Sequence, residues 1–159
     1  MNNKYFGKVE KRWAGFSAEF KFRIPYFDQE VEIFLDEEFD EEYKKITTPP
    51  TDAQVDEYEQ TLKAFLDNID EVILEIQQSA FEYYKERYAR YYEQPFEDIF
   101  DLYKGTETEN DETHPPLCLD TKEKHFEYMK DILSYIRILD NRTIRISIHY
   151  LLDTEHGLE

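Results

Sequence analysis

Residues 17–36, SAEFKFRIPYFDQEVEIFLD, decide the fold of this chain. Apolar and polar side chains alternate over residues 17–24 and again over residues 30–36, and Pro25 opens the segment between the two runs. A period of two is typical of strands with one buried and one solvated face. We therefore expect an antiparallel hairpin whose apolar face carries Phe20, Phe22 and Ile33, with a further edge strand within residues 5–12.

A long helical pattern follows this hairpin. Apolar side chains recur at intervals of three and four over residues 51–92, which predicts a helix. Thr51 and Gln54 are spaced as a capping box at its start. Because a helix of this length is unusual in a globular domain, we expect a break near Asp67-Asn68 or Gln78-Ser79. A short helix over residues 95–103 is predicted next.

The last third of the chain returns to strands. Residues 105–116 hold few side chains that could pack, so we expect a mobile acidic surface loop there. A short helix from Asp120 or Thr121 to about residue 131 precedes two strands, 135–139 and 143–151, with a turn at Asp140-Asn141. The order of strands, helices and strands predicts a single α+β domain over residues 1–159. In it an antiparallel sheet from both ends of the chain packs against a long, broken helix and shorter helices.

The composition indicates a folded protein. Of its 159 residues 35% are charged, yet it holds 13 Tyr and 12 Phe, whereas disordered acidic chains are poor in aromatic residues. Cys118 is the single cysteine, which excludes an internal disulfide, and we expect it to be a small buried side chain. The chain shows no apolar run long enough to cross a bilayer and no targeting segment, so we expect a cytoplasmic protein without a membrane partner.

The negative charge is the strongest indication of function. The formal net charge is −18, from 37 acidic and 19 basic residues. Residues 28–42 contain acids and no base, and Lys63 is the only base in residues 51–82. A concentrated acidic surface speeds association with a basic partner and repels nucleic acid. We therefore expect a basic protein partner and no direct nucleic-acid binding, although such a surface can also serve solubility alone.

Two sets of residues are predicted to bind the partner. The acidic candidates are Glu37, Glu38, Asp40, Glu41, Glu42, Asp56 and Glu59. The aromatic candidates, Tyr83 and Tyr92, lie in a tyrosine-rich stretch at the edges of its apolar stripe, next to arginines. Tyrosine and arginine are enriched where binding energy concentrates, and packing within the core is the alternative for this stretch.

No pattern for catalysis or metal binding is present in the sequence. The four histidines, His114, His125, His149 and His156, show no helical pairing, and the chain lacks a cysteine cluster, a glycine-rich phosphate loop and a serine nucleophile motif. We predict no cofactor, no metal site and no enzymatic activity. A small enzyme built on paired carboxylates stays open as an alternative.

The two ends of the chain resemble a known family. Trp13-x-Gly15 in the N-terminal part and Asp153-x-Glu155-His156-Gly157-Leu158 after the last strand are similar to a family of small uncharacterised bacterial domains. These domains occur near polymorphic-toxin loci and are often taken to be immunity proteins. The resemblance implies an inhibitor that neutralises a basic toxin, for example a nuclease. The alternative for the same charge is a DNA mimic that sequesters a DNA-binding protein.

Overall fold

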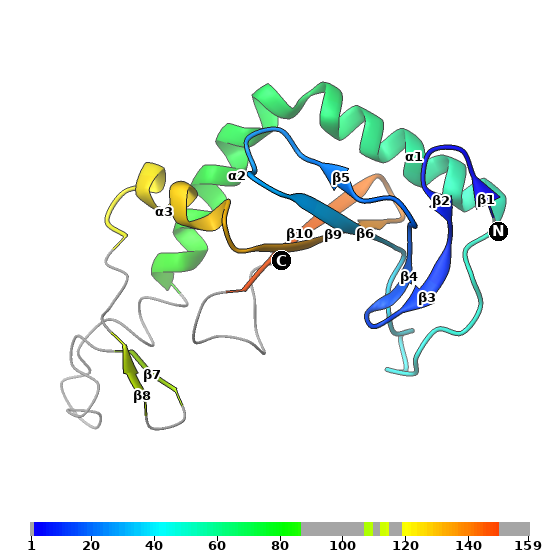
Figure 1. Ribbon diagram of the computed structural model, residues 1–159, viewed down its shortest axis with the longest axis horizontal. Coiled ribbons are helices and arrows are strands. Elements are labelled where there is room, and N and C mark those ends of the chain that lie inside the picture. The colour runs from blue at the N-terminus through cyan, green and yellow to red at the C-terminus, as the bar shows by residue number, and fades with distance from the viewer. Residues whose placement is uncertain (1, 87–106, 110–111, 115–118, 150–159) are drawn as a thin grey trace.

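The computed structural model describes residues 2–86, 107–109, 112–114 and 119–149, and among them it shows an α+β fold (Figure 1). The side chains of residues 107–109 and 112–114 lie outside this description. The main sheet has the strand order β10-β9-β6-β4-β3. Its strands are β3 (Glu10–Arg12), β4 (Gly15–Ser17), β6 (Glu30–Leu35), β9 (Leu133–Leu139) and β10 (Thr143–Ile148), and β5 (Phe22–Arg23) pairs with β6 beside them.

The two ends of the chain do build one sheet, as predicted, but they meet through a parallel pair. β6 and β9 run parallel, with Ile33 opposite Ile136, whereas the other strand pairs of this sheet are antiparallel. The expectation of a wholly antiparallel sheet was therefore wrong. The physical reason is the long connection, because a crossover that passes through the helical layer brings the chain back in its original direction.

The N-terminal hairpin is confirmed, but its first strand is interrupted. Phe22 lies opposite Val31 in the predicted antiparallel pairing, while β4 ends at Ser17. A small hairpin of β1 (Asn2–Asn3) and β2 (Gly7–Lys8) contacts the gap, where the Lys8 amide donates to Glu19 Oε2 at 2.8 Å. Phe20 is consequently 48% exposed instead of facing the core. The predicted edge strand is β3, which pairs with β4.

The long helical pattern forms two helices with the break at the first predicted position. α1 (Asp52–Asp67) ends at Asn68, and α2 (Ile69–Tyr83) begins there. The Thr51 hydroxyl accepts from the Gln54 amide at 3.2 Å, and the Gln54 side chain accepts from the Thr51 amide at 2.8 Å, so the capping box is confirmed. The predictions for residues 87–92, for the helix over 95–103 and for Cys118 lie outside the described residues.

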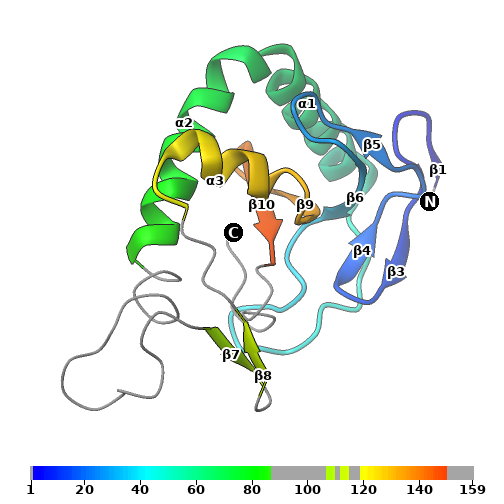
Figure 2. The same cartoon turned by 60° about the vertical axis from the view of Figure 1, so that its left-hand side comes forward.

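The helices cover one face of the sheet and enclose the main core (Figures 1 and 2). Tyr58 and Leu62 of α1 and Ile73 of α2 are buried against Ile33 and Ile136 in the middle of the sheet. α3 (Lys122–Met129) is capped by Thr121, one of the two predicted caps, and packs against α2. Each fully buried leucine or isoleucine contributes about 1.5–3 kcal/mol, so this layer supplies most of the stability.

The other face of the sheet holds a second, smaller apolar cluster that the alternation did not predict. Phe34 falls on the side expected to be solvated, yet it is fully buried with Ala14 and Tyr135. Trp13 meets the rings of Phe34 and Tyr135 edge-on, at centroid distances of 5.2 and 5.3 Å, while staying 60% exposed. The sheet is therefore apolar on both faces near its centre.

The C-terminal hairpin is confirmed, although β10 ends at Ile148 and residues 150–151 of the predicted strand lie outside the described residues. β9 and β10 pair with Ile136 opposite Ile146. Asn141 and Arg142 both have positive φ, which is typical of the tight turn that joins two antiparallel strands. Within the segment 105–116 that was predicted as a loop, β7 (Glu107–Glu109) pairs with β8 (Glu112–His114) in a small ladder. The remaining residues of that loop lie outside the described residues.

Candidate protein-binding surface

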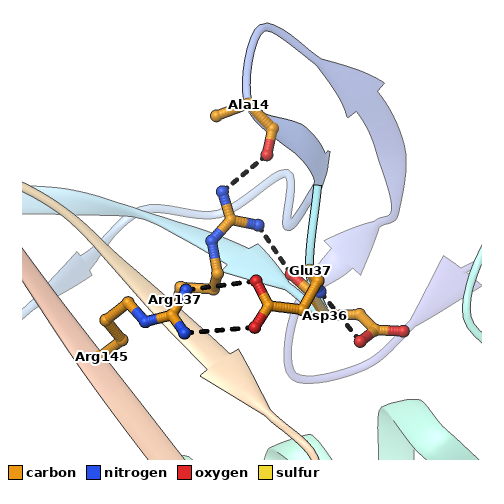
Figure 3. A network of polar contacts seen from close by, with 5 residues as sticks. All are labelled: Ala14, Asp36, Glu37, Arg137 and Arg145. Atoms are coloured by element: carbon orange, nitrogen blue, oxygen red, sulfur yellow. Dashed lines mark hydrogen bonds and ion pairs between the residues drawn. The ribbon is translucent and has the colours of Figure 1, made fainter. Parts of the chain in front are cut away.

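Glu37, the first acid predicted to bind a partner, is held inside the protein's own polar network (Figure 3). Both of its carboxylate oxygens accept from the Arg145 guanidinium at 3.1 Å, which ties the chain after β6 to β10. A bidentate pair of this kind is among the stronger charge-assisted contacts. Glu37 therefore stabilises the fold, and although its side chain is 45% exposed, a partner would have to compete with Arg145 for its carboxylate.

A buried arginine lies beside this pair. Arg137 is directly opposite Arg145 in the β9–β10 ladder and only 3% exposed. Its guanidinium donates to the carbonyls of Asp36 at 2.6 Å and Ala14 at 2.7 Å, and it lies over the rings of Phe34 and Tyr135. Carbonyl oxygens and ring faces offset the cost of burying this cation. The cluster fixes the start of the segment that carries the predicted acids.

The next predicted acids form a tight hairpin whose charges are largely satisfied within it. Asp40 accepts from the amides of Glu42 and Lys44 at 2.9 and 3.0 Å. Lys45 pairs with Glu38 at 3.3 Å, and Lys44 pairs with Glu42. These ion pairs are exposed, and such pairs contribute little to stability. Glu41 is the acid of this hairpin whose carboxylate makes no ion pair or hydrogen bond within the described chain.

The hairpin presents an aromatic side chain that the sequence analysis missed. Tyr43 is 89% exposed at the tip, with a φ of 59°. No glycine or proline marks this turn, so its only signal in the sequence is the change from Glu41-Glu42 to Lys44-Lys45. An exposed tyrosine brings a large contact area with a polar tip, which suits a binding surface.

A second acidic surface runs along the exposed side of the helices, with Glu57 and Glu75 at its margins beside the sheet, and we call it the acidic ridge. It consists of the carboxylates of Asp52, Asp56, Glu57, Asp67, Glu71 and Glu75, which are exposed and form no ion pair within the described residues. Glu59, predicted with Asp56, is instead paired with Lys63 four residues on. Because the apolar stripe of α1 and α2 faces the sheet, these carboxylates face solvent.

The predicted acids do not form one surface. Asp56 and Glu59 lie on the helical layer, whereas the hairpin after β6 lies beyond the opposite side of the sheet, as both views show (Figures 1 and 2). Proximity in the sequence suggested a continuous acidic block. The sheet separates its two halves, because the chain crosses from one face to the other between β6 and α1.

The residues of the tyrosine-rich stretch also lie in different environments. Phe81 and Tyr84 are buried, which confirms core packing for part of it. Tyr83 is half-buried and lines an apolar groove between α2 and β10. Tyr92 lies outside the described residues.

A separate polar cleft of about 270 Å³ is lined by Glu57, Tyr58, Asp140 and Arg142, among others.

The chemistry of that polar cleft is limited by its tyrosine. The Tyr58 hydroxyl donates to Asp140 at 3.1 Å. Burial, together with the negative charges of Asp36 and Asp140, raises the pKa of Tyr58 above its usual value. The hydroxyl therefore stays protonated at neutral pH. A tyrosine that acts as a nucleophile or as a general base would have to lose this proton.

The described histidines are not gathered at one site. His125 is fully buried on α3 between aromatic rings, and burial lowers its pKa to about 4. His149 is half-buried after β10, and His156 lies outside the described residues. Within the part of the chain that the structure describes, no group of three or more His, Cys, Asp or Glu side chains is placed to hold a metal ion.

Comparisons with known proteins do not assign the chain to a family. No protein-family model, no curated protein and no solved structure matches it. Among the described residues, none of the helices is both long and apolar enough to cross a membrane.

Proposed function

We propose that this protein binds a basic protein partner through the acidic ridge and, in line with the family resemblance of its two ends, acts as a cytoplasmic immunity protein that neutralises a toxin. The observation that carries this proposal is the set of ridge carboxylates without an internal counter-ion in the described chain. Like charges on one surface repel each other, and a cationic partner relieves that repulsion when it binds.

The distribution of charge supports a protein partner better than a nucleic-acid partner or mimicry of duplex DNA. Residues 52–75 of the helical layer carry eight acids and Lys63, a net charge of −7. At 1.5 Å per residue they span about 35 Å, so the density is one charge per ~5 Å. Duplex DNA carries one charge per about 1.7 Å. The ridge is thus roughly threefold too sparse to imitate the duplex, while it is sufficient to steer a basic protein.

The hairpin with Tyr43 is the weaker candidate for the same role. Its acids are paired with Lys44 and Lys45, so a partner would have to displace these contacts. We therefore assign the principal role to the ridge and expect the hairpin to contribute less.

The proposal is tested by comparing two variants with equal changes in charge. The ridge variant combines Asp56→Asn, Asp67→Asn and Glu71→Gln, and the hairpin variant combines Glu38→Gln, Glu41→Gln and Glu42→Gln. Proteins are captured from lysate of the source cells with the full-length chain, identified and purified. The association rate of each variant is then measured against salt concentration.

We expect the ridge variant to associate about tenfold more slowly than the unmodified protein at low salt, and the hairpin variant to change much less. Raising the salt concentration should slow association more than it speeds dissociation. An association rate that depends on neither salt nor the ridge would refute the proposal. For the immunity role, the captured protein should halt growth when produced alone, and co-production of this chain should restore it.

A DNA mimic gives a different pattern. The captured protein would then be a DNA-binding protein, and duplex DNA would compete with this chain for it. Growth arrest by the captured protein would not be expected in that case.

A further inference from the structure

The two edges of the main sheet differ in how well they are protected. β3 forms one edge with only three residues, Glu10–Arg12, all charged and exposed. β10 forms the other edge with six residues, Thr143–Ile148, and within the described chain it pairs only with β9. Short, charged edges resist the addition of another strand, whereas a long edge of β-branched residues accepts one. Among the residues that the structure describes, β10 is therefore the open edge of this sheet.

An apolar groove runs alongside this open edge. Two adjoining cavities of about 310 and 460 Å³ lie between the helices and β10, and both are lined by Val72, Ile76, Ile144 and Ile146. Ile144 and Ile146 are only half-buried, so the sheet edge leaves apolar surface in the groove. A strand added to β10 would direct every second side chain towards these residues.

The charges around the groove define what can enter it. Glu75, a member of the acidic ridge, lines the groove on the α2 side, and Arg142 lines its end at the β9–β10 turn. A segment with basic side chains is therefore favoured near Glu75. A second copy of this chain is disfavoured, because each copy carries a net charge of −18.

We propose that the open edge of β10 and the groove beside it bind an extended segment of the basic partner by strand addition, with alternate apolar side chains in the groove and basic side chains beside Glu75. Backbone hydrogen bonds to the edge strand supply affinity in such complexes, and the pockets for alternate side chains supply specificity. This inference rests on the proposed function for the charge of the partner; the groove shares only Glu75 with the acidic ridge, and the ridge variant leaves Glu75 unchanged.

The test uses defined peptides in place of the unidentified partner. A fluorescent ten-residue peptide of alternating valine and lysine is compared with one of alternating serine and lysine, which has the same charge. A third peptide carries N-methyl groups on the backbone of alternate residues and cannot complete a strand ladder. Binding of each peptide to the full-length protein is measured by fluorescence anisotropy.

We expect the valine peptide to bind at least about tenfold more tightly than the serine peptide, because its apolar side chains are buried in the groove. The N-methylated peptide should bind no more tightly than the serine peptide. Val72→Gln should remove the preference for valine as well, whereas Leu74→Gln, two residues away on the outer side of α2 and 62% exposed, should preserve it. Ile144→Gln provides a second groove variant if Val72→Gln does not fold.

Equal binding of the valine and serine peptides would overturn the inference, and this is also the result expected if another part of this chain fills the groove. A preference for valine that survives both groove substitutions would overturn it too. The ridge variant separates the two proposals: it should weaken both lysine peptides equally and leave the preference for valine intact. If the groove substitutions leave the preference for valine unchanged while the ridge variant behaves as expected, strand addition is refuted and the proposed function still stands.

Discussion

The buried histidine on α3 should make the protein less stable in mild acid. The His125 ring is fully buried, with its centroid 5.0 Å from that of Tyr84 and 6.1 Å from that of Phe81. Burial disfavours the charged imidazolium and lowers the pKa of His125 from 6.5 to about 4. This contact joins α3 to α2 near the end of the groove, where Met129 is one of the lining residues.

The sign and size of the effect follow from the two pKa values. Below pH 6.5 the unfolded chain binds a proton at His125, while the folded chain binds it only below about pH 4. The free energy of unfolding therefore falls as the pH drops through this window. The full loss is about 3 kcal/mol, of which about 2 kcal/mol is reached at pH 5.

Urea unfolding at pH 7 and pH 5 measures this loss. His125→Phe keeps an aromatic ring in contact with Tyr84 and cannot be protonated, so it is the matched control. Carboxylates also titrate in this range, but they are common to both proteins and cancel in the comparison. We expect the unmodified protein to lose about 2 kcal/mol more than His125→Phe between pH 7 and pH 5. Equal losses in the two proteins would contradict the burial of His125 that the structure shows.

Three further predictions concern the stability of the fold, each measured as the free energy of unfolding at pH 7. Thr51→Ala removes the capping box of α1 and should cost about 1 kcal/mol, while Thr48→Ala, outside the helix, should cost little. Glu37→Gln breaks the bidentate pair with Arg145 and should also cost about 1 kcal/mol; no change would mean that this pair does not hold the hairpin to the sheet. Leu62→Ala opens a cavity at a fully buried site and should cost about 2–5 kcal/mol, against a small effect for Leu74→Ala on the exposed side of α2.

Most of the secondary structure could be predicted because its signals are local. The capping box at Thr51, the break at Asn68 and the cap at Thr121 each involve residues within a few positions of one another. Such contacts form in a single turn of helix, so the sequence of that turn is sufficient to predict them. The misplaced side chains, Phe20 and Phe34, are those whose burial depends on a distant element: the β1–β2 hairpin displaces one, and Trp13 and Tyr135 cover the other.

The exposure and pairing of the acids predicted to bind a partner could be predicted only in part. The count of acids correctly indicated exposed carboxylates, and Asp56 is part of the acidic ridge. Glu37, Glu38, Glu42 and Glu59 proved to be paired within the chain. The partner of Glu37 is 108 residues away, so no spacing in the sequence could reveal the pair. Glu38, Glu42 and Glu59 have partners close in the sequence, but which acid each lysine contacts depends on the turn or helix geometry.

The sequence by itself determined the α+β class, the positions of α1, α2 and α3 and of the two main hairpins, and the excess of negative charge, because periodicity, capping and composition are properties of neighbouring residues. Only the tertiary structure decided that β6 and β9 pair in parallel, that the acids divide between two sides of the sheet, and that β10, within the described part of the chain, is an edge strand beside an apolar groove. These features depend on which distant segments meet when the core is buried. Packing across the whole domain decides which segments meet, so this cannot be predicted from any single stretch of the chain.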